Sequence, residues 1–135
     1  MIGGAPPPGT PLAQIRLAGA AALAHGESRT FVFERAGKPF EGFILRHALG
    51  FFAYANSCPH WNVDLDLGFG DFYDAEADRI FCRNHGALFL PATGECTAGP
   101  CAGLFLEPFD VQVDGADVVV SVPRLTLIGA ENLGS

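Results

Sequence analysis

The chain has 135 residues, the usual size of a single domain, and carries 15 acidic against 8 basic side chains, for a formal charge of −7. With so few cations, it is expected to bind neither the phosphate backbone of a nucleic acid nor a membrane surface. Hydrophobic residues make up 49% of the chain and charged residues 17%, a composition that excludes a disordered chain and indicates a folded one.

The chain begins with a stretch rich in Pro and Gly, and residues 1–11 are expected to be a flexible leader. The domain itself is expected over residues 12–123, and residues 124–135 are expected to be a tail. An apolar run at residues 17–24 is short and made of small side chains, so neither an export signal nor a membrane span is expected there. A cytoplasmic location, in which thiols stay reduced, follows as the expectation.

Short apolar runs separated by turn residues fill the rest of the chain, at residues 30–35, 43–46, 51–54, 79–81, 88–90, 111–113 and 118–120. Two pairs of these runs have the pattern of a hairpin, one around residues 48–50 and one around Asp114-Gly115, a dipeptide that suits a tight turn. No apolar stripe with the period of a helix is present. Many short strands at close spacing predict an all-β fold, either a sandwich or a barrel.

Two short motifs each pair one thiol with one imidazole. They are Cys58-Pro59-His60 and Cys82-Arg83-Asn84-His85, separated by the 21 residues at positions 61–81. Such a mixed donor set suits either a tetrahedral zinc ion or a 2Fe-2S cluster in which one iron takes two thiolates and the other takes two imidazoles. Zinc sites usually group like ligands, whereas here each motif mixes them, which favours the cluster.

At these motifs the chain resembles the Rieske 2Fe-2S family, from about residue 26 to residue 122. The resemblance rests on CPHW at 58–61, CRNHGALF at 82–89 and GECTAGP at 94–100, the last of which is similar to the family's proline loop. It implies a Rieske-like antiparallel β-sandwich with a small cluster-binding subdomain formed by two loops, at about residues 56–101. It also implies one Rieske-type 2Fe-2S cluster bound by four ligands, which are Cys58, His60, Cys82 and His85.

The resemblance further implies a set of residues around the cluster, namely Pro59, Trp61, Leu65, Gly86, Ala87, Phe89, Gly99 and Pro100. Among these, Leu65 matches an apolar position beneath the cluster, and Trp61 is expected to pack under its motif.

Several other residues near the motifs could have a role or none. Cys96 and Cys101 are expected to be buried thiols, with a disulfide or a redox-sensitive pair as the alternative. Asp64 and Asp66 are expected to be solvated loop carboxylates, and the two remaining histidines, at positions 25 and 47, are expected on the surface.

Departures from the family pattern indicate a subclass. Rieske proteins of cytochrome bc complexes have an additional Cys in each motif, where this chain has Val63 and Asn84, so the disulfide of those proteins is excluded. They also have a Ser and a Tyr that donate hydrogen bonds to the cluster and its ligand, where this chain has Ala87 and Phe89. Loss of these donors predicts a reduction potential toward the low end of the family, roughly −150 mV.

Together these features predict a stand-alone, monomeric Rieske-type ferredoxin. It would not be an enzyme, but an electron carrier that passes single electrons from a reductase to an oxygenase or hydroxylase. The chain is too short to hold also the mononuclear iron domain of an oxygenase subunit. The alternatives are a Rieske module that acts as a redox sensor or as a subunit of a larger complex, and a zinc-stabilised binding domain.

Overall fold

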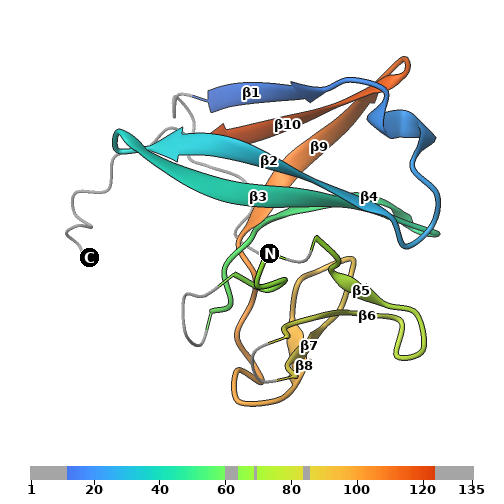
Figure 1. Ribbon diagram of the computed structural model, residues 1–135, viewed down its shortest axis with the longest axis vertical. Coiled ribbons are helices and arrows are strands. Elements are labelled where there is room, and N and C mark those ends of the chain that lie inside the picture. Colours follow the sequence, from blue (N-terminus) through green and yellow to red (C-terminus); the bar gives the residue numbers. More distant parts are fainter. Residues whose placement is uncertain (1–11, 60–63, 69, 84–85, 124–135) are drawn as a thin grey trace.

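The computed structural model describes residues 12–59, 64–68, 70–83 and 86–123, whose strands form two antiparallel sheets (Figure 1). The larger sheet has the order β1-β10-β9-β4-β3-β2 and the smaller has the order β5-β6-β7-β8. The strands of the larger sheet are β1 (Leu12–Leu17), β2 (Ser28–Arg35), β3 (Lys38–His47), β4 (Gly50–Ala55), β9 (Pro108–Asp114) and β10 (Asp117–Pro123). Those of the smaller sheet are β5 (Tyr73–Asp74), β6 (Arg79–Phe81), β7 (Leu88–Phe89) and β8 (Cys96–Ala98).

A single 3-10 turn, η1 (Ala20–Ala22), is the one helical element in the described part of the chain. It lies within the apolar run at 17–24, and both Leu17 and Ala20 from that run are buried in the core. No helix among the described residues is long and apolar enough to cross a lipid bilayer. The prediction of an all-β fold is confirmed.

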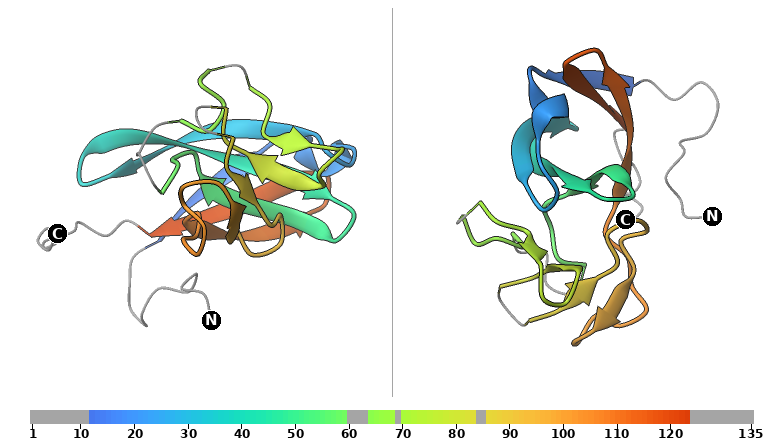
Figure 2. Two further views of the ribbon diagram at one scale, coloured as in Figure 1. Left: turned by 90° about the horizontal axis from the view of Figure 1, so that it is seen from below. Right: turned by 90° about the vertical axis from the view of Figure 1, so that its right-hand side faces the viewer.

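The larger sheet curls on itself until its two edge strands, β1 and β2, contact each other (Figure 2). In strand β10, Val118, Val120 and Val122 are fully buried, while the residues between them are partly exposed. One face of this strand therefore lines the inside of the curl. The core enclosed there is made of apolar side chains from all six strands and η1, among them Phe31, Phe33, Ile44 and Phe109.

A second core lies between the larger sheet and the smaller one, and strand β3 contributes to both. Phe43 and Leu45 point into this second core, whereas Ile44 between them points into the curl. A strand that is buried on both faces has a continuous apolar run, which is the pattern at residues 43–45. Phe72, in the connection before β5, stacks on Phe43 with ring centroids 4.0 Å apart and 7° between the planes. The smaller sheet is thereby attached to the face of the larger one.

Both predicted hairpins form, each with a turn that differs by one residue. Strands β3 and β4 pair from Gly42–Ala55 to His47–Gly50, so the turn residues are Ala48 and Leu49, and Gly50 belongs to β4. Strands β9 and β10 also pair, but Asp114 is opposite Asp117, so the turn residues are Gly115 and Ala116 rather than Asp114 and Gly115. Gly115 has φ +62°, and a two-residue hairpin turn with glycine in its first central position meets the twist of the flanking strands.

Candidate metal centre

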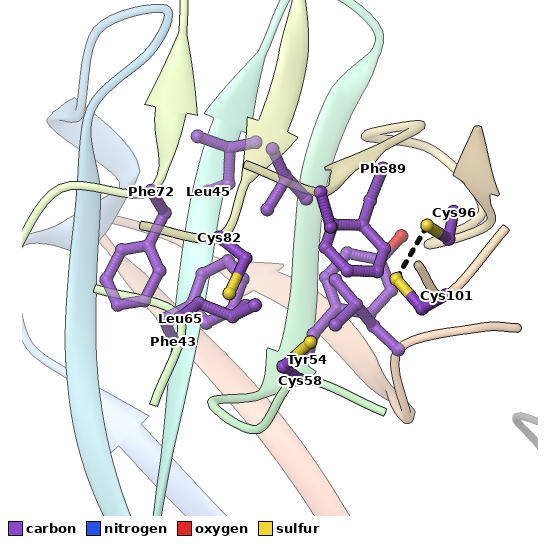
Figure 3. Close-up of a cluster of buried hydrophobic side chains, with 13 residues drawn as sticks. Phe43, Leu45, Tyr54, Cys58, Leu65, Phe72, Cys82, Phe89, Cys96 and Cys101 are labelled. Atoms are coloured by element: carbon purple, nitrogen blue, oxygen red, sulfur yellow. Dashed lines mark hydrogen bonds between the residues drawn. The ribbon is translucent and has the colours of Figure 1, made fainter. Parts of the chain in front are cut away.

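The two predicted thiol ligands come from different segments and meet in one core. Cys58 follows the end of β4, and Cys82 directly follows β6. Their exposed fractions are 1% and 0%, and both lie in the core between the sheets, as Figure 3 shows. Their predicted partners His60 and His85, like Trp61, Val63 and Asn84, lie outside the described residues.

The second ligand segment is a tight turn between β6 and β7. The Gly86 N–H donates to the Cys82 carbonyl and the Cys82 N–H donates to the Ala87 carbonyl, both at 2.9 Å. Gly86 is exposed with φ +70°, a conformation that favours glycine. Ala87 and Phe89 are fully buried. These hydrogen bonds therefore hold the backbone of Cys82 in place directly after β6.

A backbone hydrogen bond joins the two ligand segments. The Arg83 N–H donates to the Leu65 carbonyl at 2.9 Å, and the Leu65 side chain is fully buried in the same core as Cys58 and Cys82. Leu65 thus shares a core with both predicted thiol ligands. The Arg83 guanidinium forms a two-pronged ion pair with Asp71 at 2.7 Å, so the long stretch between the motifs braces the second ligand segment.

A buried polar network organises the first ligand segment, and sequence reasoning missed it. Asn56, 4% exposed, accepts the Leu65 N–H at 2.8 Å and donates to Asp66 at 3.1 Å. Asp66 in turn accepts the N–H groups of Gly68 and Gly70 at 3.2 and 2.9 Å. The prediction that Asp66 is solvated is wrong, because it is 3% exposed and its oxygens close this loop. An Asp placed two and four residues before glycines was the available signal, since such side chains cap turns.

The segment that resembles a proline loop packs against the second ligand segment. Gly99 has φ +99°, and a Cβ built on it would lie 2.9 Å from the Ala87 Cα. Only a glycine allows this approach, which explains the residue type. Pro59 is half-buried beside Cys58, and Pro100 is exposed at the tip of the loop.

A second polar cluster lies where the tip of the β5–β6 hairpin meets the end of β3. His47 is 5% exposed, so the prediction of a surface position is wrong for it, whereas His25 is exposed as predicted. His47 Nε2 lies 2.8 Å from Asp78 Oδ1, and His25 Nε2 lies 3.1 Å from the Tyr73 hydroxyl, which itself donates to Asp78. The hydrogen bonds from Tyr73 and His47 hold the pKa of the Asp78 carboxyl below its ordinary value.

The atoms of His25, His47 and Asp78 that could ligate a metal ion lie within 4.8 Å of one another, close enough to suggest a metal site. However, the Leu49 N–H donates to His47 Nδ1 at 3.2 Å, which leaves the proton of a neutral imidazole on Nε2, facing Asp78. Hydrogen bonds therefore account for this cluster, and it fastens the long stretch between the motifs to the larger sheet.

The residues around Cys58 and Cys82 fit an iron–sulfur cluster. Two thiols from separate turns are held in one apolar core, which suits a group bound by thiolates and shielded from water. The side chains of Ala87 and Phe89, both buried there, offer no hydroxyl donor toward such a group.

Comparison with known proteins identifies the family of the domain. The model of the Rieske 2Fe-2S domain matches residues 14–109. No curated protein matches the chain. Among solved structures, the ferredoxin of carbazole 1,9a-dioxygenase from Nocardioides aromaticivorans is 32% identical, with a TM-score of 0.60 over 79% of this chain and 95% of that chain.

Two further structures are similar at a lower sequence identity. A ferredoxin of Sphingomonas yanoikuyae is 26% identical, with a TM-score of 0.62 over 82% of this chain and 100% of that one. A chain in a complex of reduced oxygenase and oxidized ferredoxin of carbazole 1,9a-dioxygenase is also 26% identical, with a TM-score of 0.62 over 83% of this chain and 95% of that one. In structure the chain is similar to these ferredoxins, and it belongs to the Rieske family, whose domain holds a 2Fe-2S cluster.

Proposed function

We propose that this protein is a low-potential Rieske-type ferredoxin that passes single electrons from a reductase to an oxygenase or hydroxylase. The observation that carries the proposal is the pair of buried thiols, Cys58 and Cys82, held in one core by a domain that spans nearly the whole length of known ferredoxins. A 2Fe-2S cluster, when bound, supplies reversible one-electron chemistry.

Four residues would hold that cluster, two from each motif. Cys58 and Cys82 would bind one iron as thiolates, and His60 and His85 would bind the other through their imidazoles. The core around the thiols excludes water, and the turn closed by Gly86 holds the backbone of Cys82.

The low potential follows from the side chains beside the thiols. Hydrogen bonds to the sulfurs stabilise the more negative, reduced state and raise the potential. Ala87 and Phe89 follow Cys82 in the chain, are fully buried, and carry no hydroxyl group. We therefore expect a potential near the lower limit of the family, roughly −150 mV.

An oxygenase partner is supported by the similarity to a chain in an oxygenase–ferredoxin complex and by the surface of this chain. Leu104 and Phe105, in the same loop as Cys101, keep 46% and 43% of their surface exposed. Apolar side chains exposed together on a carrier suit a transient interface. The net charge of −7 would add steering toward a basic partner, and this steering would weaken with salt.

The test begins with protein purified without oxygen. Absorption and EPR spectra should show a Rieske-type cluster, and a redox titration should place its potential below those of hydroxyl-containing Rieske centres. Cys82→Ser should abolish the cluster signal, whereas Cys101→Ser, a matched change at another buried thiol, should retain it. A colourless protein that contains one zinc ion would overturn the proposal.

The partner is tested by reconstitution. The reduced protein should support product formation when mixed with a flavin-dependent reductase and an aromatic-ring oxygenase, and the rate should fall as salt is added. A spectroscopically intact cluster that accepts electrons but delivers none to any oxygenase tested would favour the sensor or complex-subunit alternative.

A further inference from the structure

Two thiols in the structure have no part in the proposed cluster site. Cys96, at the start of β8, and Cys101, in the loop that follows it, are 2% and 1% exposed. Both lie in the core between the sheets, near Tyr54 and Phe89 (Figure 3). Because free thiols pack as small apolar groups, burial alone would give them no function.

Their geometry goes beyond packing. The Sγ atoms of Cys96 and Cys101 lie 2.6 Å apart, joined by the dashed line in Figure 3, so a bond between them needs only a small movement. The backbone holds the two residues in this position. The Cys96 N–H donates to the Leu104 carbonyl and the Leu104 N–H donates to the Cys101 carbonyl, both at 2.8 Å.

We propose that Cys96 and Cys101 are a dithiol–disulfide pair that is oxidised by low-molecular-weight disulfides of the glutathione type. One thiolate attacks the small disulfide and releases one molecule of reduced thiol, which leaves a mixed disulfide on the protein. The other thiolate then attacks that mixed disulfide, forms the Cys96–Cys101 bond and releases the second molecule of thiol. Two protein thiols are thereby oxidised, one small disulfide is reduced to two thiols, and the two protons end on those thiols.

The location of the pair gives the disulfide a consequence. It would close the loop at residues 96–101, whose Gly99 packs against Ala87 in the second ligand segment. The disulfide would therefore hold this loop against the second ligand segment.

The experiment counts thiols in the cluster-containing protein. The protein is incubated with oxidised or reduced glutathione, quenched with acid, unfolded, and labelled with N-ethylmaleimide. Four labels are expected after the reduced treatment and two after the oxidised treatment. Peptide mapping should then find the two labels on Cys58 and Cys82, and a peptide with residues 96 and 101 that is lighter by two hydrogen atoms. Four labels after oxidation, or a disulfide that involves Cys58 or Cys82, would overturn the proposal.

Single variants separate formation of the pair from access of the oxidant. Cys101→Ser and Cys96→Ser should each retain one glutathione as a mixed disulfide, because the second thiol needed to release it is missing. The wild-type protein should retain none. If a variant takes up glutathione while the wild type keeps four thiols, the two residues do not pair. If neither variant reacts, oxidants of this class do not reach the site, and the proposal fails.

The loop-closing effect is measured separately, by urea unfolding of the oxidised and reduced forms. For a loop of this size the disulfide should lower the unfolding equilibrium constant by roughly 30-fold. An unchanged constant in protein that has the disulfide would overturn the stabilising role. The thiol count does not depend on which residues bind the cluster or on any redox partner, so its failure and a failure of the proposed electron transfer are distinguishable.

Discussion

The contact between Gly99 and Ala87 allows a sharp test of how the proline-like loop supports the ligand segment. A Cβ at position 99 would lie 2.9 Å from the Ala87 Cα and 3.2 Å from its Cβ, and the backbone there has φ +99°. Gly103, in the same loop, has φ +89° with nothing within 4 Å of the added Cβ. Gly103→Ala is therefore a matched control, which adds the same methyl group and similar backbone strain without the contact.

The magnitudes follow from these two environments. A side chain at such a φ costs about 1–3 kcal/mol of folding free energy in either variant. Overpacking against the backbone of Ala87 should cost Gly99→Ala about 1–3 kcal/mol more. Replacing glycine with alanine also lowers the conformational entropy of the unfolded chain. This effect is the same in both variants and cancels when they are compared. The expected difference is large relative to a total stability of about 5–15 kcal/mol.

Urea unfolding, followed by circular dichroism, measures the difference between the two variants. Visible absorption of the cluster is the second measurement. The Ala87 carbonyl accepts the Cys82 N–H, so a displacement of Ala87 would also displace the proposed ligand Cys82. We expect Gly99→Ala to have the lower midpoint and to lose cluster absorption, and Gly103→Ala to keep its absorption. Equal midpoints together with equal cluster content would refute the assignment of this contact.

Three further changes probe the site and the core. Phe89→Tyr adds a hydroxyl beside the cluster segment and should raise the reduction potential by on the order of 50 mV. A hydrogen bond to the reduced site should be about 1 kcal/mol stronger than one to the oxidised site, and a one-electron couple shifts by 59 mV for about 1.4 kcal/mol. A redox titration that finds no rise would contradict the low-potential argument. Tyr54 is buried, and its hydroxyl donates to the Pro91 carbonyl at 2.7 Å. Tyr54→Phe should therefore lower the free energy of unfolding by about 1–2 kcal/mol without altering the cluster spectrum. An unchanged free energy of unfolding would show that the hydrogen bond is not stabilising. Burial, and then the hydrogen bond to Asp78, raise the pKa of Tyr73 to about 12, so the folded protein keeps a proton that the unfolded chain loses near about pH 10. Stability from this group should be complete below that pH and fall as the pH rises toward 12; an ultraviolet titration should show a tyrosine transition there that Tyr73→Phe removes, and a transition near pH 10 instead would rule out the raised pKa.

The family and the β class could be predicted from local features of the sequence. The spacing within Cys58–His60 and Cys82–His85 defines a mixed donor set whatever surrounds it. The hairpin around residues 48–50 follows from turn residues between apolar runs, because short-range backbone preferences act over a few residues. The turn between β9 and β10 shows the limit of such reasoning: the glycine was recognised, but the pairing of Asp114 with Asp117 shifted the turn by one residue.

Only the tertiary structure decided which polar side chains are buried. Asp66 and His47 have an ordinary polar character in the sequence, and their burial depends on partners from other segments, Asn56 for one and Asp78 for the other. For Cys96 and Cys101 the expected burial is confirmed, and the tertiary structure adds that their Sγ atoms lie 2.6 Å apart. A buried polar group is stable only when hydrogen bonds replace its water, and the bonds to Asn56 and Asp78 form only because the fold brings distant segments together.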